Sequence, residues 1–212
     1  MTSLRALGTA ALGGFLLTAT VVVGLRAADA AITVGAFALV TVLLTWYARW
    51  GSNDAGSALA VTNPIAALAL VSVKRLAAAD LLPVVAAQVV GAVVAGGLGL
   101  LTEDVLGEPL VWTAPTVLVT LVVAVLAGAV ATWATLAVDA DGPVALAAAA
   151  PVVAGAGASL VLVAVAHPAV LVGLAVTGLV DLTTAGFGIA AALLTSLVAA
   201  RTVSVLVPRS AD

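Results

Sequence analysis

Long apolar stretches joined by short polar connections make up most of the chain. Six of them are long enough, at about 20 residues each, to cross a bilayer as helices. Two further apolar stretches, 63–73 and 168–178, are too short to cross, and each starts around an Xaa-Pro pair. Proline fits the first turn of a helix, so each pair predicts a short helix that begins inside the membrane. The six expected spans are Leu4–Leu25, Ile32–Trp50, Asp80–Leu101, Thr113–Val138, Val144–Val165 and Thr183–Val207.

An acidic connection around Glu103 and Glu108 divides this pattern into two halves, 1–107 and 108–212. Each half contains three full spans and one short helix. Because three is an odd number, the second half must be inverted in the membrane relative to the first. The first stretch could be mistaken for a secretory signal, but it is long enough to span and five more spans follow, so we expect it to be retained.

Composition and charge support a bilayer as the solvent. Hydrophobic residues make up 64% of the chain and charged residues only 8%, and the mean hydropathy is +1.34. With the N-terminus inside, only Arg26 falls on the outer side, and the following basic residues fall on the cytoplasmic side: Arg5, Arg49, Lys74, Arg75, Arg201 and Arg209. This distribution predicts an integral protein of the cell (plasma) membrane with both termini cytoplasmic. The absence of cysteine excludes disulfides and thiolate metal sites.

The first half carries a spaced set of motifs. Asn63-Pro64-Ile65 opens the short apolar helix, Arg75 follows it, Asp80 is expected to cap the third span, and that span contains Ala87-Gln88-Val89-Val90-Gly91. This order resembles the aquaporin and glycerol-facilitator (major intrinsic protein) family, as a divergent prokaryotic-type member in which Ile65 replaces the usual Ala. The resemblance implies an all-α membrane protein with six transmembrane helices plus two re-entrant half-helices in an inverted repeat, and a homotetramer.

The second half departs from the family. His167-Pro168-Ala169-Val170 stands where the family carries Asn-Pro-Ala-Arg. The family's Arg forms its narrowest polar constriction, so Val170, with Val40 as an expected partner, implies a wider and apolar outer constriction. The family's buried Glu pair is also missing.

The resemblance implies that the pore runs past the two Xaa-Pro pairs, and the following residues are expected to line it: Asn63, Pro64, Ile65, His167, Pro168 and Ala169. The Asn63 side chain suits an N-cap, and its amide can donate to a passing solute. Neutral His167 could replace the second Asn as a donor, and its protonation at acid pH is a hypothesis for gating. Backbone carbonyls before each short helix, expected to be unpaired, would supply acceptors. The alternatives to these pore-lining roles are that Asn63 only kinks a loop and that His167 never titrates.

The two positive helix ends would oppose cations while neutral solutes pass. We therefore expect a passive channel for small neutral solutes: water, glycerol-like polyols, other small uncharged molecules or gases. One alternative is a non-conducting aquaporin-like protein whose pore is filled by Val and Ile side chains. A proton-coupled carrier is another, although only His167 would be ionisable within the membrane.

Other functions find little support in the sequence. No span carries a carboxylate pair, a Ser-His-Asp set or a cluster of metal ligands, so we expect no enzyme, no metal and no cofactor. The expected partners are the lipid bilayer and a small neutral solute, with no nucleic acid. Two polar side chains have structural interpretations: Gln88 should form an interhelical hydrogen bond, and Asp181 should cap the sixth span, with a place at the outer mouth of the pore as the alternative.

Overall fold

The computed structural model describes residues 3–27, 31–49, 55–102, 117–137, 164 and 167–206. Within these residues the chain forms eight α-helices and one π-helical segment, and no strand. The helices are α1 (Leu4–Arg26), α2 (Phe37–Arg49), α3 (Ala55–Thr62), α4 (Pro64–Ser72), α5 (Ala78–Leu101), α7 (Val117–Ala137), α9 (Pro168–Val176) and α10 (Leu182–Leu206); the π-helical segment η1 (Ala31–Ala36) precedes α2.

Among the described residues, four helices are long and apolar enough to cross a membrane: α1, α5, α7 and α10. They confirm the coarser prediction, an all-α membrane protein. The second predicted span corresponds to η1 and α2, which contain a shorter apolar helix, Thr33–Ala48. The predicted span Val144–Val165 lies outside the described residues, apart from Ala164.

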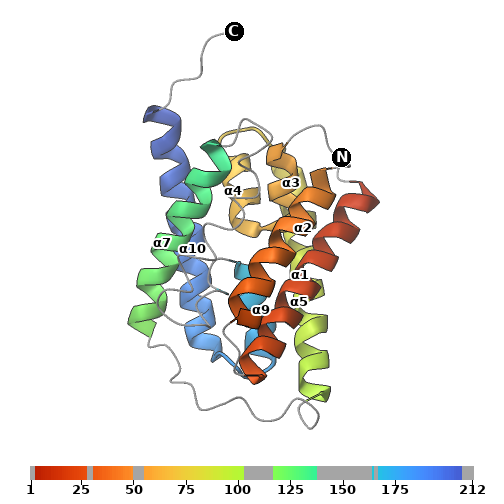
Figure 1. The fold of residues 1–212 in the computed structure, drawn as a ribbon. Coiled ribbons are helices and arrows are strands. Elements are labelled where there is room, and N and C mark those ends of the chain that lie inside the picture. Colours follow the sequence, from red (N-terminus) through yellow and green to blue (C-terminus); the bar gives the residue numbers. More distant parts are fainter. Residues whose placement is uncertain are drawn as a thin grey trace.

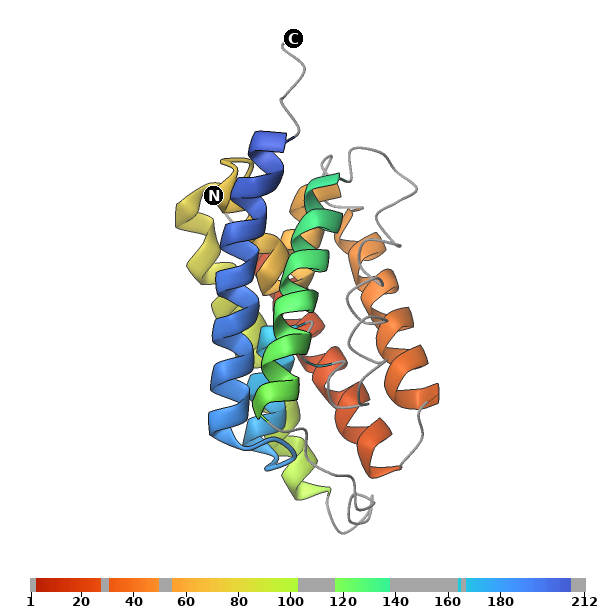
Figure 2. The same ribbon diagram turned by 90° about the vertical axis from the view of Figure 1, so that its left-hand side faces the viewer.

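Two pairs of long helices pack closely through glycine. α1 packs against α5, and α7 packs against α10 (Figures 1 and 2). A Cβ added at Gly91 of α5 would collide with the Ala11 carbonyl of α1, and one at Gly128 of α7 would collide with the Ala192 carbonyl of α10. Small residues thus allow the backbones to approach, as is typical of helices packed in lipid.

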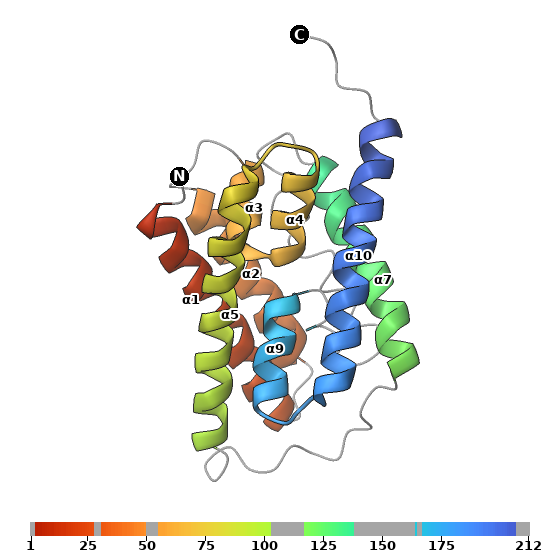
Figure 3. The ribbon, with the colours of Figure 1, turned by 180° about the vertical axis from the view of Figure 1, so that it is seen from behind.

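The two short helices lie between α5 and α10. Figure 3 shows α4 above α9 in this position, while α5 and α10 run in opposite directions beside them. Both short helices contact both α5 and α10. Each has nine residues and is therefore about 14 Å long, less than half of a hydrocarbon core of about 30 Å.

The short helices and the long helices that follow them repeat the same local structure. Helix starts at 64 and 168, left-handed residues at 74 and 178, and helix starts at 78 and 182 are each 104 positions apart. Lys74 (φ 61°) and Gly178 (φ 72°) make the same turn. Behind it, Arg75 N donates to Leu70 O at 2.9 Å and Leu179 N donates to Leu174 O at 3.1 Å. This is the hydrogen bond of a Schellman motif.

Two details of the sequence analysis were wrong. Residues 55–62, which no predicted span or short stretch included, form α3, a helix that the sequence did not predict. Asp80 does not cap α5, because the helix begins two residues earlier and its N-cap is Ala77, which has no side-chain acceptor. Asp181, by contrast, caps α10 as predicted: Thr184 N donates to its Oδ1 at 2.8 Å.

Candidate functional site

The first short helix begins at a break in a longer helical segment. Asn63 has extended backbone angles (φ −146°, ψ 127°) and separates α3 from α4. Its Oδ1 accepts a hydrogen bond from Ile65 N at 2.8 Å, which confirms the predicted N-cap. The Asn63 side chain is half-exposed, although Pro64 and Ile65 beside it are buried. Asn63 is therefore less completely buried than the two residues that follow it.

The backbone carbonyls before α4 are not unpaired, contrary to expectation. The last carbonyls of a helix lack partners within it. Here Gln88 Nε2 donates to Ala60 O at 3.1 Å and to Val61 O at 2.7 Å. His167 Nε2 lies 2.6 Å from Thr62 O. Gln88 therefore forms the predicted interhelical bond, and these side chains occupy acceptors that were expected to face a solute.

His167 connects the second short helix to the first. It stands at the N-cap of α9 but makes no capping hydrogen bond, and its ring instead bonds Thr62, the residue before Asn63. Since a carbonyl oxygen only accepts, Nε2 carries the hydrogen. In the neutral ring Nδ1 is then an acceptor, and it has no partner among the described residues. The free ring nitrogen of neutral His167 is thus an acceptor, whereas the sequence analysis expected a donor.

Two threonines near α9 also carry buried hydroxyls without partners among the described residues, Thr18 on α1 and Thr120 on α7. Thr18 packs against Gly173 of α9, and Thr120 packs against Gly188 of α10. Threonine in an apolar helix usually donates to the carbonyl four residues earlier, as Thr41 does to Phe37 O at 2.8 Å. Sequence reasoning missed Thr18 because one hydroxyl on an apolar span gives no sign of where it faces.

The predicted constriction residues lie in a packed cluster. Val170 and Ile65 are each 0% exposed, and both belong to a buried apolar cluster that also contains Leu174. Val40 is half-buried and packs against this cluster. Val170 thus belongs to a packed cluster that Val40 also contacts, and the Val170 side chain has no exposed surface.

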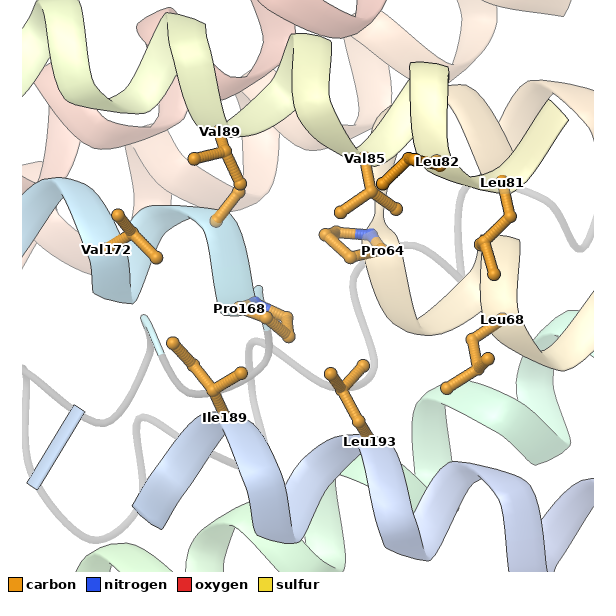
Figure 4. A pocket seen from close by; sticks show the side chains of 11 residues that line it. Pro64, Leu68, Leu81, Leu82, Val85, Val89, Pro168, Val172, Ile189 and Leu193 are labelled. Atoms are coloured by element: carbon orange, nitrogen blue, oxygen red, sulfur yellow. The ribbon is translucent and has the colours of Figure 1, made fainter. Parts of the chain in front are cut away.

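The remaining predicted residues lie on an apolar cavity of about 280 Å³ between α4, α5, α9 and α10. Pro64, Pro168 and Ala169 contribute to its lining, which contains only apolar residues. Figure 4 shows the two proline rings side by side at its centre. Asn63 and His167 do not line this cavity, so the predicted site residues face at least two different environments.

The start of α4 is anchored by a short chain of hydroxyl groups. Thr132 of α7 donates to Ser196 of α10 at 2.7 Å, and Ser196 lies 3.4 Å from Ile65 O. All three residues are buried. Among the described residues there is no group of three His, Cys, Asp or Glu that could hold a metal ion.

Comparison with models of known protein families gives no match, and the sequence has no significant match among curated proteins.

Proposed function

We propose that this membrane protein is a passive channel for small neutral solutes, built like an aquaporin from six spans and two re-entrant half-helices. The observation that carries the proposal is the hydrogen bond between His167 Nε2 and Thr62 O, 2.6 Å long and 105 residues apart in sequence. It joins the N-terminal ends of the two short helices. Two positive helix ends meeting within the bilayer would repel cations and admit neutral molecules.

Unpartnered polar atoms support a path for such solutes. His167 Nδ1 and the hydroxyls of Thr18 and Thr120 are buried without partners in the described part of the chain. Buried polar atoms generally have a hydrogen-bond partner, and water or a hydroxylated solute would provide one. The half-exposed Asn63 would add an amide near the meeting point of the helices.

The inverted repeat and the orientation belong to the same proposal. The 104-residue repeat and the opposite directions of α5 and α10 support two inverted halves, with boundaries near 107 and 108. α1 begins and α2, α4 and α10 end at one end of the bundle (Figure 1). Basic residues stand at or near these ends, which supports a cytoplasmic location for this side and for both termini, in the plasma membrane. A homotetramer is proposed from the family resemblance alone.

Stopped-flow light scattering of proteoliposomes tests the proposal. Shrinkage is measured in sucrose, glycerol and urea gradients, with protein-free vesicles as the reference. We expect faster shrinkage or faster solute entry for at least one of these solutes. Rates equal to protein-free vesicles in every gradient would falsify a channel for water and small polyols.

A specific observation also favours the non-conducting alternative. Ile65 and Val170 are fully buried, so both side chains fill space that a pore would need. If they close the pore, Ile65→Ala and Val170→Ala should raise permeability above the wild-type rate. Val90→Ala on the exposed face of α5 is the matched control and should have no effect. Unchanged rates in both core variants would remove these side chains as the barrier.

Gating by protonation of His167 is a separate hypothesis. A charge on this buried ring would lie beside two positive helix ends, which is unfavourable. The ring is therefore expected to be protonated only at strongly acid pH, at about pH 4 or below, where wild-type flux should fall below flux at about pH 8, while flux in His167→Asn should be equal at both values. Equal wild-type flux at both values would remove the hypothesis without affecting the channel itself.

A further inference from the structure

The apolar cavity opens onto the outer surface of the bundle. Its walls are α5 and α10, and its floor is formed by α4 and α9 (Figures 3 and 4). Leu82, which lines the cavity, is 77% exposed, and beside the cavity α5 exposes Val90 (60%) and α10 exposes Leu194 (63%). Exposed apolar side chains on spanning helices contact lipid hydrocarbon, so the cavity is continuous with the lipid-facing surface.

The two repeats contribute equivalent residues to this groove. Leu68 and Val172, Val85 and Ile189, and Val89 and Leu193 all line it, and the members of each pair are 104 positions apart. The lining residues therefore extend from one short helix to the other between α5 and α10 (Figure 4). An elongated apolar occupant matches this shape and lining.

We propose that this groove binds one hydrocarbon chain of a membrane lipid. The lining provides no polar partner for a headgroup, a carboxylate or a hydrated solute, so only the chain is recognised. The rings of Pro64 and Pro168 lie at its floor, at the first residues of the two short helices. A bound chain thus contacts both helix starts from the lipid side. This inference depends on the membrane location and not on conduction.

Photolabelling of the full-length protein tests the proposal. The protein is reconstituted into phosphatidylcholine vesicles that contain a small fraction of phosphatidylcholine with a diazirine near the end of one chain. After irradiation, intact-mass and top-down fragmentation mass spectrometry locate the adducts. We expect the adducts to concentrate on 64–68, 81–89, 168–172 and 189–193. Equal labelling of all exposed apolar helix faces would overturn the proposal.

Matched variants distinguish the groove from the rest of the surface. Val89→Trp fills the groove from α5, and Leu193→Trp fills it from the equivalent position of α10. Each should reduce groove adducts about tenfold, because the chain loses contact with much of the lining. The neighbouring variants Val90→Trp and Leu194→Trp, on exposed positions, should retain wild-type labelling. Undiminished groove adducts in a folded filling variant would contradict the assignment.

A second copy of the chain is the main competing occupant. Since the chain contains no cysteine, Val89→Cys introduces a single thiol in the groove. If a lipid chain occupies the groove, oxidation should give no more disulfide dimer than Val90→Cys gives. Preferential dimerisation through Val89→Cys would assign the groove to a protein interface and overturn the proposal.

Discussion

The two short helices end in the same way but begin differently. Both are nine residues long, both start with proline, and both end in a left-handed residue that closes the same hydrogen bond. At the start of α4, Asn63 caps its own helix. At the start of α9, His167 leaves its helix uncapped and bonds the other half of the protein. The two short helices therefore share their length and the turn that ends them. The residues before the two prolines, Asn63 and His167, make different contacts.

This difference has a physical consequence. The Asn63 side chain satisfies a local donor, so the capping bond of α4 needs no residue from another helix. The start of α9 depends on tertiary structure, because its N-cap side chain is committed to Thr62 on α3. The same histidine, with Gln88, also satisfies the final carbonyls of α3. The first half thus relies on the second for the ordering of its own broken helix.

The largest expected effect comes from Gln88, which supports only the first helix start. Gln88→Leu removes the donor to the buried Ala60 O and the partly buried Val61 O and leaves both carbonyls without that partner. We expect a loss of about 2 kcal/mol in the free energy of unfolding, measured by circular dichroism during SDS titration of detergent-solubilised protein. Val90→Leu on the exposed face should change it by less than about 0.5 kcal/mol. A loss no greater than that of the control would mean that the carbonyls tolerate being unpaired.

The two N-cap residues provide the most direct comparison. His167→Ala removes the bond to Thr62 O and a ring that is only 2% exposed, and should cost about 1.5 kcal/mol. Asn63→Ala loses a local cap and should cost about 1 kcal/mol. His167→Asn should recover only part of the loss, because Asn can cap α9 but is too short to replace the ring. The same unfolding titration measures all three, and full recovery in His167→Asn would show that the bond between the halves adds no stability.

The matching turns at 74 and 178 should respond in opposite directions. A Cβ at Gly178 would meet no atom within 4 Å, so Gly178→Ala tests the left-handed backbone alone and should cost about 1 kcal/mol. Lys74 adopts the same conformation with a side chain, so Lys74→Gly should gain about 0.5 kcal/mol. Thermal unfolding in detergent measures both changes. Changes of the same sign would indicate that the two turns are not equivalent.

The smallest expected change in stability comes from the N-cap residues of α5 and α10, which begin at 78 and 182. Hydrogen bonds from the Thr184 side chain and backbone N–H hold the pKa of Asp181 below its usual range. The unfolded state then binds the proton more tightly, so the stabilisation is present at neutral pH and is lost as pH falls through the folded pKa. Asp181→Ala should therefore destabilise the protein at about pH 7 and have little effect at about pH 2. At the equivalent position of α5, Ala77 makes no side-chain capping bond, so this helix start provides the comparison.

Ala77 offers the reverse experiment. Ala77→Ser would give α5 the side-chain cap that α10 already has, and should stabilise the protein by about 0.5 kcal/mol without pH dependence, since serine does not titrate in this range. Unfolding at the same two pH values distinguishes the two substitutions. A pH-independent effect of Asp181→Ala would contradict the role assigned to its charge.

The sequence predicted the long helices and the two short helices better than the segments that join them. The positions of α1, α5, α7 and α10 followed from the length of the apolar stretches, and the starts of α4 and α9 followed from their prolines. The helix α3 was missed because Gly56 and Ser57 have loop-like composition, whereas packing against α2 and α4 outweighs their weak helix propensity. The N-cap of α5 was misplaced because Ala77–Ala79 gives no capping signal.

In the candidate site, too, local features could be predicted from the sequence, whereas contacts between distant residues could not. The sequence by itself determined a helical membrane protein, two short helices that begin at Pro64 and Pro168, and the capping role of Asn63, because these depend on apolar length and local hydrogen bonding. Only the tertiary structure decided that His167 bonds Thr62, that Gln88 holds the carbonyls of α3, and that Val170 is buried rather than exposed to a pore. Each of these joins residues far apart in the chain, and their distances depend on how the helices pack, which local sequence does not encode.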